Sequence, residues 1–333
     1  MPDSVSLPFC VPVFSFTPGH AAAGFALNGH PTGYNAYLNQ CTTVGCTRRF
    51  LRGFTTPQMG IPRAWIGSFP YIEHYSVSSR FGYPHYRNII KLMLDQGFYV
   101  YFNGIDDFYM PGKCWYGIRH MAHDGIICGY DDNDQTYSIA AYDINWLFSL
   151  IKIPQDSLIE GLNACINNKQ YGGLTAYKMR ENAVVSLDEK MILRNLKTYV
   201  DQTVDKYPLD QDGWIEGIAT HDFLAMYLDK IKEGFIPADK MDWRALRPVW
   251  EHKRCMLDRI KAIEEKRGWD AELSSKYAPL VEDTNRVRMM YAMYHKTQKE
   301  SLLDKMKNGI LTFKSKEEEI LKDFIKRMEE EGI

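Results

Sequence analysis

The sequence predicts an α+β protein in which an N-terminal part of short strands and helices precedes a helical C-terminal part. Charge is distributed unevenly, because residues 1–155 hold 20 of the Asp, Glu, Lys and Arg residues and residues 156–333 hold 62. Aromatic residues show the opposite bias, with 28 of 44 before residue 156. No charged residue occurs between Asp3 and Arg48, and a segment so poor in charge must be largely buried or must line an apolar cleft. We therefore expect two domains, 1–155 and 156–333.

The C-terminal part has the periodicity of amphipathic helices. Apolar residues recur at three- and four-residue spacing on charged backgrounds, which is typical of helices that pack against one another. Pro237, the region of Gly268 and Gly309 are expected to separate the helices. The expected helices cover residues 187–204, 221–233, 243–266, 280–308 and 314–331.

The N-terminal part alternates between strand and helix signals. Short runs rich in β-branched or aromatic residues predict strands. These runs cover residues 98–103, 124–130 and 136–143. The polar residues 131–135 predict a hairpin loop between the last two strands. Helices are expected at residues 42–51, directly after Cys41, and at 86–95, with Gly97 closing the second helix.

Composition excludes several classes of protein. The net charge of −2 gives no electrostatic footprint for nucleic acid or an anionic membrane, so neither is expected as a partner. No run of eighteen apolar residues predicts a transmembrane helix, and the N-terminus lacks the basic segment of a signal peptide. The seven cysteines include no CxxC pair, which favours free thiols over disulfides. We expect a cytoplasmic protein.

Cys41 is the first candidate for chemistry. A thiol at the start of a helix feels the positive end of the helix dipole and the unpaired N–H groups, which favour the nucleophilic thiolate. The alternative is a buried structural cysteine. Cys46 is a rival nucleophile, but a thiol in the middle of the expected helix gains nothing from the dipole.

His123 and Asp143 are candidates for the proton-transfer groups. His123 opens an expected strand, where its imidazole can point into a cleft and accept a proton from a thiol. The predicted hairpin brings Asp143, at the end of the next strand, beside His123. A carboxylate in that place would fix the imidazole tautomer and stabilise imidazolium. The alternative is a hydrogen-bonded structural histidine.

The order Cys41, His123, Asp143 resembles that of papain-like cysteine enzymes. The stretch His-Asp-Gly-Ile-Ile-Cys-Gly-Tyr-Asp-Asp from residue 123, followed by Ala-Ala-Tyr-Asp, is similar to the pattern of the bacteriocin-processing peptidase branch. The whole chain looks closer to an offshoot named after the butirosin-biosynthesis acyltransferase H. That offshoot shares Ile-Asp-Asp-Phe-Tyr-Met-Pro-Gly, here residues 105–112, and a Trp-Glu-His-Lys-Arg-type segment, here residues 250–254.

The resemblance implies a papain-like N-terminal domain and a cysteine-dependent acyltransferase. Cys41 would be the nucleophile, His123 the base and then the acid, and Asp143 the group that orients His123. The reaction would move an acyl or peptidyl group from a carrier-protein thioester to a small amine through an acyl-cysteine. Family members act in nonribosomal peptide and aminoglycoside pathways, and a relative in closthioamide assembly forms amide bonds. No cofactor is implied beyond the phosphopantetheine arm of the carrier protein.

Four further residues are expected near the substrate. Papain-like enzymes carry an oxyanion-binding glutamine six residues before the cysteine; here that position is Asn35, and Gln40 is the only glutamine nearby. Asn35 can instead belong to a turn beside Gly33. Asp106 and Asp107 can hold the ammonium group of an amine, or can form a turn and strand cap.

Two rival functions and one rival site stay open. The same three residues would serve a cysteine peptidase or amidase, since only the acceptor differs. A non-catalytic protein that binds a ligand or a carrier is the second rival. A zinc site can be drawn from neighbouring Cys and His residues, but their spacing matches no chelating pair, so no metal is expected. The residues of that set are Cys114, His120, His123 and Cys128.

Overall fold

The computed structural model describes residues 2–53, 56–78, 83–168, 173–242 and 244–333. It is an α+β protein with antiparallel sheets and a helical C-terminal part, which confirms the predicted class. Its contacts divide the chain into two compact units. Unit 1 comprises Met1–Tyr34 and Ala64–Val185, and unit 2 comprises Asn35–Arg63 and Ser186–Ile333. A domain boundary at residue 155 stays a prediction.

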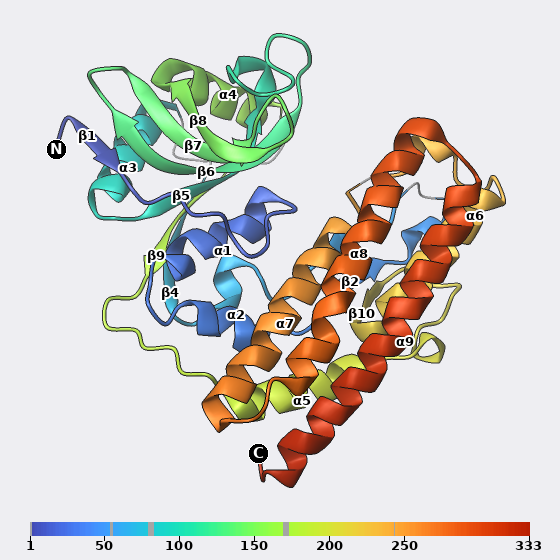
Figure 1. The fold of residues 1–333 in the computed structure, drawn as a ribbon. Helices are drawn as coiled ribbons and strands as arrows, with labels where there is room; N and C mark the ends of the chain where they lie inside the picture. Colours follow the sequence, from blue (N-terminus) through green and yellow to red (C-terminus); the bar gives the residue numbers. More distant parts are fainter. Residues whose placement is uncertain (1, 54–55, 79–82, 169–172, 243) are drawn as a thin grey trace. The chain divides into compact units, whose positions relative to one another are not determined.

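Unit 1 is built on a seven-stranded antiparallel sheet (Figure 1). The strand order is β4-β9-β5-β6-β7-β8, and β1 pairs with β6. The strands are β1 (Ser4–Ser6), β4 (Ile72–Ser78), β5 (Tyr99–Asp106), β6 (Ala122–Asp131), β7 (Thr136–Tyr142), β8 (Phe148–Pro154) and β9 (Gly173–Met179). The three strands expected from the sequence are β5, β6 and β7, and the predicted hairpin joins β6 to β7 through the register Asp131↔Thr136.

Helices cover both faces of this sheet because its strands alternate two sets of apolar side chains. On one face, Val100 and Phe102 of β5 enter a core with α3 (Tyr83–Asp95) and α4 (Gln155–Asn167). On the other face, Tyr99 packs against Phe25 of α1 (Pro18–Asn28), with ring centroids 5.5 Å apart.

The helix expected at residues 86–95 is α3. Gly97 follows it with φ +80°, the left-handed conformation expected of a glycine that closes a helix.

Unit 2 is mainly helical (Figure 1). Its helices are α2 (Tyr34–Gln40), whose first residue belongs to unit 1, α5 (Glu189–Val200), α6 (Thr220–Lys232), α7 (Arg247–Arg267), α8 (Glu272–Thr297) and α9 (Ser301–Glu330). A small antiparallel sheet has the order β10-β2-β3, with β10 (Trp214–Glu216), β2 (Gly45–Thr47) and β3 (Met59–Gly60). The helices expected at 187–204 and 221–233 are α5 and α6. The one expected at 243–266 is α7, apart from residue 243, which lies outside the described residues.

The helix expected at residues 42–51 is wrong. The preceding polar run forms α2, and residues 42–51 instead hold β2 and the start of a short 3₁₀ helix (Arg49–Arg52). β2 pairs with β10, residues that lie far away in the sequence, and this long-range pairing overrides the local helix signal.

The helix break expected at Gly309 is also wrong. The break falls at Gln298, with φ +50°, and α9 then runs through Gly309 without interruption. A Cβ at position 309 would lie 2.6 Å from Cγ2 of Val287 in α8. The glycine therefore serves close packing of α8 on α9 rather than a helix end.

A fully buried polar cluster ties the helices of unit 2 together. Lys253 of α7 and Glu317 of α9 form an ion pair of 2.6 Å, and neither side chain is exposed. Tyr199 and Tyr277 each donate a hydroxyl hydrogen bond to Glu317, at 2.9 and 2.6 Å. The carboxylate thus receives hydrogen bonds from side chains of α5, α7 and α8, as a buried charge requires.

No helix in the described part of the chain is long and apolar enough to cross a membrane.

Candidate functional site

A histidine–aspartate pair in unit 1 is the best-formed candidate for proton transfer. Nδ1 of His123 donates a hydrogen bond of 2.6 Å to Oδ2 of Asp107. The carboxylate is fully buried, whereas the imidazole is 31% exposed. Nζ of Lys113, itself buried, lies 3.6 Å from the other oxygen of Asp107. A carboxylate on Nδ1 fixes the tautomer in which the lone pair of Nε2 can accept a proton.

The backbone of β5 and β6 sets up this pair. The register between the two strands shifts between Phe102 and Ile105, where Gly104 has φ +113°. After the shift, Ile105 pairs with His123, and Asp107 begins a 3₁₀ helix directly after β5. The bulge thus places the carboxylate at the end of one strand and the imidazole near the start of its neighbour.

Asp106 has a mainly structural role. Its Oδ1 accepts hydrogen bonds of 3.1 Å from the backbone N–H groups of Phe108 and Met121. Its Oδ2 accepts one of 2.7 Å from Nδ1 of His120, a largely exposed histidine. The expected turn cap is therefore present at Asp106, and Asp107 is the carboxylate that contacts His123.

Asp143 has other partners than the expected one. Its Oδ1 accepts hydrogen bonds from the N–H groups of Asn145 and Leu147, and its Oδ2 accepts one from the hydroxyl of Ser149. These bonds close the turn between β7 and β8. Among the described residues, the carboxylate bonded to His123 is that of Asp107, not that of Asp143.

Cys41 lies at the opposite end of a helix from the one expected. Its N–H donates to the carbonyl of Tyr37, so the residue follows the last turn of α2, where the helix dipole is negative. The side chain is fully buried, and its thiol donates to the carbonyl of Arg63 at 3.6 Å. Burial raises the pKa of Cys41 well above its usual value, and Cys255 nearby adds to the rise.

The rival thiol is no better placed. Cys46 lies in β2, is fully buried, and has its pKa raised to about 12 by burial. Asn35 and Gln40, expected near the oxyanion, are the second and last residues of α2. These residues and Cys41 belong to unit 2, whereas His123, Asp107 and the other expected carboxylates belong to unit 1.

A second polar cluster in unit 1 has no counterpart in the sequence-based expectations. Oδ2 of Asp124 accepts hydrogen bonds from the N–H of Gly19, at the start of α1, and from the hydroxyl of Tyr101, at 2.9 and 3.0 Å. Burial raises the pKa of Asp124, although these two bonds oppose the rise.

The start of α1 is capped by Thr17, whose hydroxyl accepts a hydrogen bond from the N–H of His20. The Thr-Pro pair at residues 17–18 is a helix-start signal that predicts α1.

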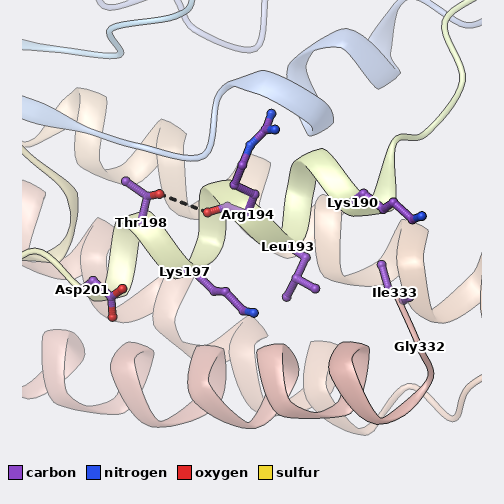
Figure 2. Close-up of a pocket in the computed structure, with 8 residues that line it drawn as sticks. All are labelled: Lys190, Leu193, Arg194, Lys197, Thr198, Asp201, Gly332 and Ile333. Carbon is purple, nitrogen blue, oxygen red and sulfur yellow. Dashed lines mark hydrogen bonds between the residues drawn. The ribbon is translucent and has the colours of Figure 1, made fainter.

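A pocket of about 590 Å³ lies in unit 2 along α5 and the C-terminus of the chain (Figure 2). Figure 2 shows Arg194 and Lys197 pointing away from each other on α5, so their cations do not converge. Lys197 is already paired with Glu329. The pocket therefore lacks the converging charged groups of a catalytic site.

No group of three or more His, Cys, Asp or Glu side chains in the described ranges could hold a metal ion. Comparison with known proteins adds no identification, since no family model and no curated protein sequence matches the chain.

Proposed function

We propose that this protein transfers an acyl group from a carrier-bound thioester to an amine, with His123 as the general base. The observation that carries the proposal is the hydrogen bond from Nδ1 of His123 to the buried carboxylate of Asp107. That bond leaves Nε2 on a partly exposed ring, where an incoming amine can reach it. The thioester donor and the amine acceptor come from the resemblance to the butirosin-type acyltransferases.

The reaction needs one base and no redox chemistry. The amine nitrogen attacks the thioester carbonyl, and Nε2 of His123 takes a proton from that nitrogen. Asp107 stabilises the imidazolium that forms. The tetrahedral intermediate then expels the phosphopantetheine thiolate, which receives the proton from His123. A C–N bond has formed, a C–S bond has broken, and His123 has regained its starting state.

The proposal uses direct attack by the amine rather than an acyl-cysteine. Cys41 and Cys46 are both buried with raised pKa values, which disfavours the thiolate that an acyl-cysteine route requires. One helix that packs on the sheet of unit 1 is α1; its first turn, Pro-Gly-His-Ala, contains no thiol or hydroxyl, and the Thr17 hydroxyl before it caps the helix. A papain-like enzyme would carry its nucleophile at such a helix start.

The papain-like relationship of unit 1 remains part of the proposal. It is supported by an antiparallel sheet that carries a histidine near the start of β6 and a helix, α1, packed against that sheet. Carrier proteins and their reduced thiols belong to the cytoplasm, so the proposal also implies a cytoplasmic protein.

The test measures amide formation from an acyl-phosphopantetheine thioester and a panel of small primary amines by mass spectrometry. We expect His123→Gln to lower the rate about 10²–10⁴-fold, the usual contribution of a positioned base. His120→Gln is the matched control, because His120 is a nearby histidine with its own carboxylate partner. Equal losses in the two variants would contradict the assignment of His123.

Intact-mass spectrometry separates the rival routes. Direct attack predicts amide product without an acyl adduct on the protein, and undiminished turnover in Cys41→Ala. An adduct that disappears in Cys41→Ala would establish the acyl-cysteine route instead. Equal consumption of thioester with and without amine would indicate a hydrolase, and no consumption would indicate a binding protein.

A further inference from the structure

Unit 2 contains a polar pocket that the proposed acyl transfer does not use. Its volume is about 290 Å³, just below the range of about 300–1,000 Å³ that is usual for ligand pockets. A ligand the size of a free amino acid fits this volume. The lining residues that bear on the argument are Thr42, Arg63, Asn195, Gln202, Trp214 and Glu216.

Arg63 supplies a cation that no carboxylate neutralises in the described part of the chain. Its Nη1 donates to Oδ1 of Asn195 at 3.3 Å. The Asn195 amide is buried and is held in turn, because its Nδ2 donates to the carbonyl of Asn39 at 3.0 Å. One end of the guanidinium is thus positioned, and its remaining N–H groups are available to a carboxylate, which Arg binds in a bidentate manner.

Glu216 supplies the opposite charge to the same pocket. No ion pair joins its carboxylate to Arg63 or to any other described cation. Its backbone is fixed by pairing with Gly45 and by a hydrogen bond of 3.2 Å from its N–H to the hydroxyl of Tyr207. An unpaired cation and an unpaired carboxylate in one small pocket match a ligand that carries both charges.

Trp214 contributes an aromatic side chain to the lining of the pocket. A Cβ at Gly45 would lie 2.6 Å from Nε1 of Trp214, so the indole occupies the space that the glycine leaves open. The indole is therefore held by the β2–β10 pairing and offers a face to an apolar side chain or an ammonium group.

We propose that this pocket binds a small zwitterion of the amino-acid class, with the ligand carboxylate on Arg63 and its ammonium group on Glu216. The ligand side chain packs against Trp214. The site is independent of the acyl transfer proposed above, since its occupancy is measured without turnover.

The full-length protein is first screened by thermal shift against the twenty free L-amino acids. The strongest binder is then measured by isothermal titration calorimetry beside its two single-charge counterparts, the amine without the carboxylate and the acid without the ammonium group. We expect each counterpart to bind about 10- to 100-fold more weakly than the zwitterion, the usual range for a lost charged hydrogen bond.

Charge-removing variants assign each ligand group to its partner. In Arg63→Gln, the zwitterion is expected to bind no better than the amine, and in Glu216→Gln no better than the acid. Arg194→Gln is the matched control, since it removes an exposed cation of α5 that does not line this pocket. Melting temperatures without ligand verify that each variant is folded. Absence of binding by all twenty amino acids, or binding unchanged in both pocket variants, would overturn the proposal.

Discussion

The Nδ1 atom of His123 lies 2.6 Å from Oδ2 of Asp107, a residue sixteen positions earlier in the chain. The carboxylate partner therefore precedes the histidine, and it directly follows β5, the strand that carries the bulge. The partner expected from the sequence, Asp143, follows it and closes the β7–β8 turn instead.

The first prediction concerns this pair. In Asp107→Asn the amide can no longer fix the productive tautomer of His123, so acyl transfer should fall by about 10²–10⁴-fold, with most of the loss in kcat. The measurement is a kcat and KM comparison across pH. Asp143→Asn provides the contrast, because the bonds of its Oδ1 go to the N–H groups of its own turn and not to His123. A larger kcat loss in Asp143→Asn than in Asp107→Asn would favour the sequence-based assignment.

The second prediction concerns thiol reactivity. Iodoacetamide at pH 8 should modify Cys10 and Cys114, which are partly exposed, before it modifies Cys41 or Cys46 in the native protein. The pKa of about 12 at Cys46 keeps that thiol protonated at this pH. Peptide mapping by mass spectrometry measures the order. Rapid native modification of Cys41 would mean that its thiol opens to solvent and would restore it as a candidate nucleophile.

The third prediction concerns acid stability. Burial lowers the pKa of His20 from 6.5 to about 3, so the unfolded state binds a proton that the folded state does not. This contribution to stability is present above pH 6.5 and is lost as the pH falls toward 3, at up to about 1.4 kcal/mol per pH unit. The free energy of unfolding, measured by urea denaturation, should therefore fall less steeply from pH 6.5 to pH 4 in His20→Gln than in the unchanged protein. An unchanged slope would contradict a neutral His20.

The fourth prediction concerns the contact between α8 and α9. Gly→Ala inside a helix usually stabilises by about 1 kcal/mol, but Gly309→Ala should destabilise by roughly 1–3 kcal/mol because its methyl group meets Val287. Val287→Ala in the same chain should recover part of the loss. Free energies of unfolding for the two single variants and the double variant test this coupling; simple additivity would rule out the contact.

The fifth prediction concerns the buried ion pair. Lys253→Met leaves Glu317 without its cation and should lower the free energy of unfolding by roughly 3–5 kcal/mol. Lys276→Met, which removes an exposed helical ion pair, should leave the free energy of unfolding nearly unchanged. Urea denaturation of the two variants provides the comparison. Similar losses of unfolding free energy would show that the buried ion pair contributes no more to stability than the exposed one.

Local patterns predicted those elements whose pairing partners lie close in sequence. The hairpin of β6 and β7 needs only one short loop, and the strand-start position of His123 follows from it. Amphipathic periodicity likewise placed α5, α6 and α7, since each buries one face whatever its neighbour is.

The rest depends on contacts between distant residues, which a single sequence does not reveal. The choice of β2 over a helix at residues 42–51 depends on β10, and the place of Gly309 inside α9 reflects close packing on Val287. Asp107, rather than Asp143, is bonded to His123 because a one-residue bulge in β5 shifts the register between β5 and β6. Each is a tertiary effect that overrides a local signal.

The end of α2 depends on an arginine more than two hundred residues later. Nε of Arg259 donates to the carbonyl of Leu38, and its Nη2 donates to the carbonyls of Tyr37 and Cys41. Leu38 belongs to the last turn of α2, whose carbonyls lack helical donors, Tyr37 also accepts from the N–H of Cys41, and Cys41 directly follows the helix. During synthesis on the ribosome, α2 emerges long before α7. The carbonyls at the end of α2 therefore lack the hydrogen bonds from Arg259 until most of the chain has been made.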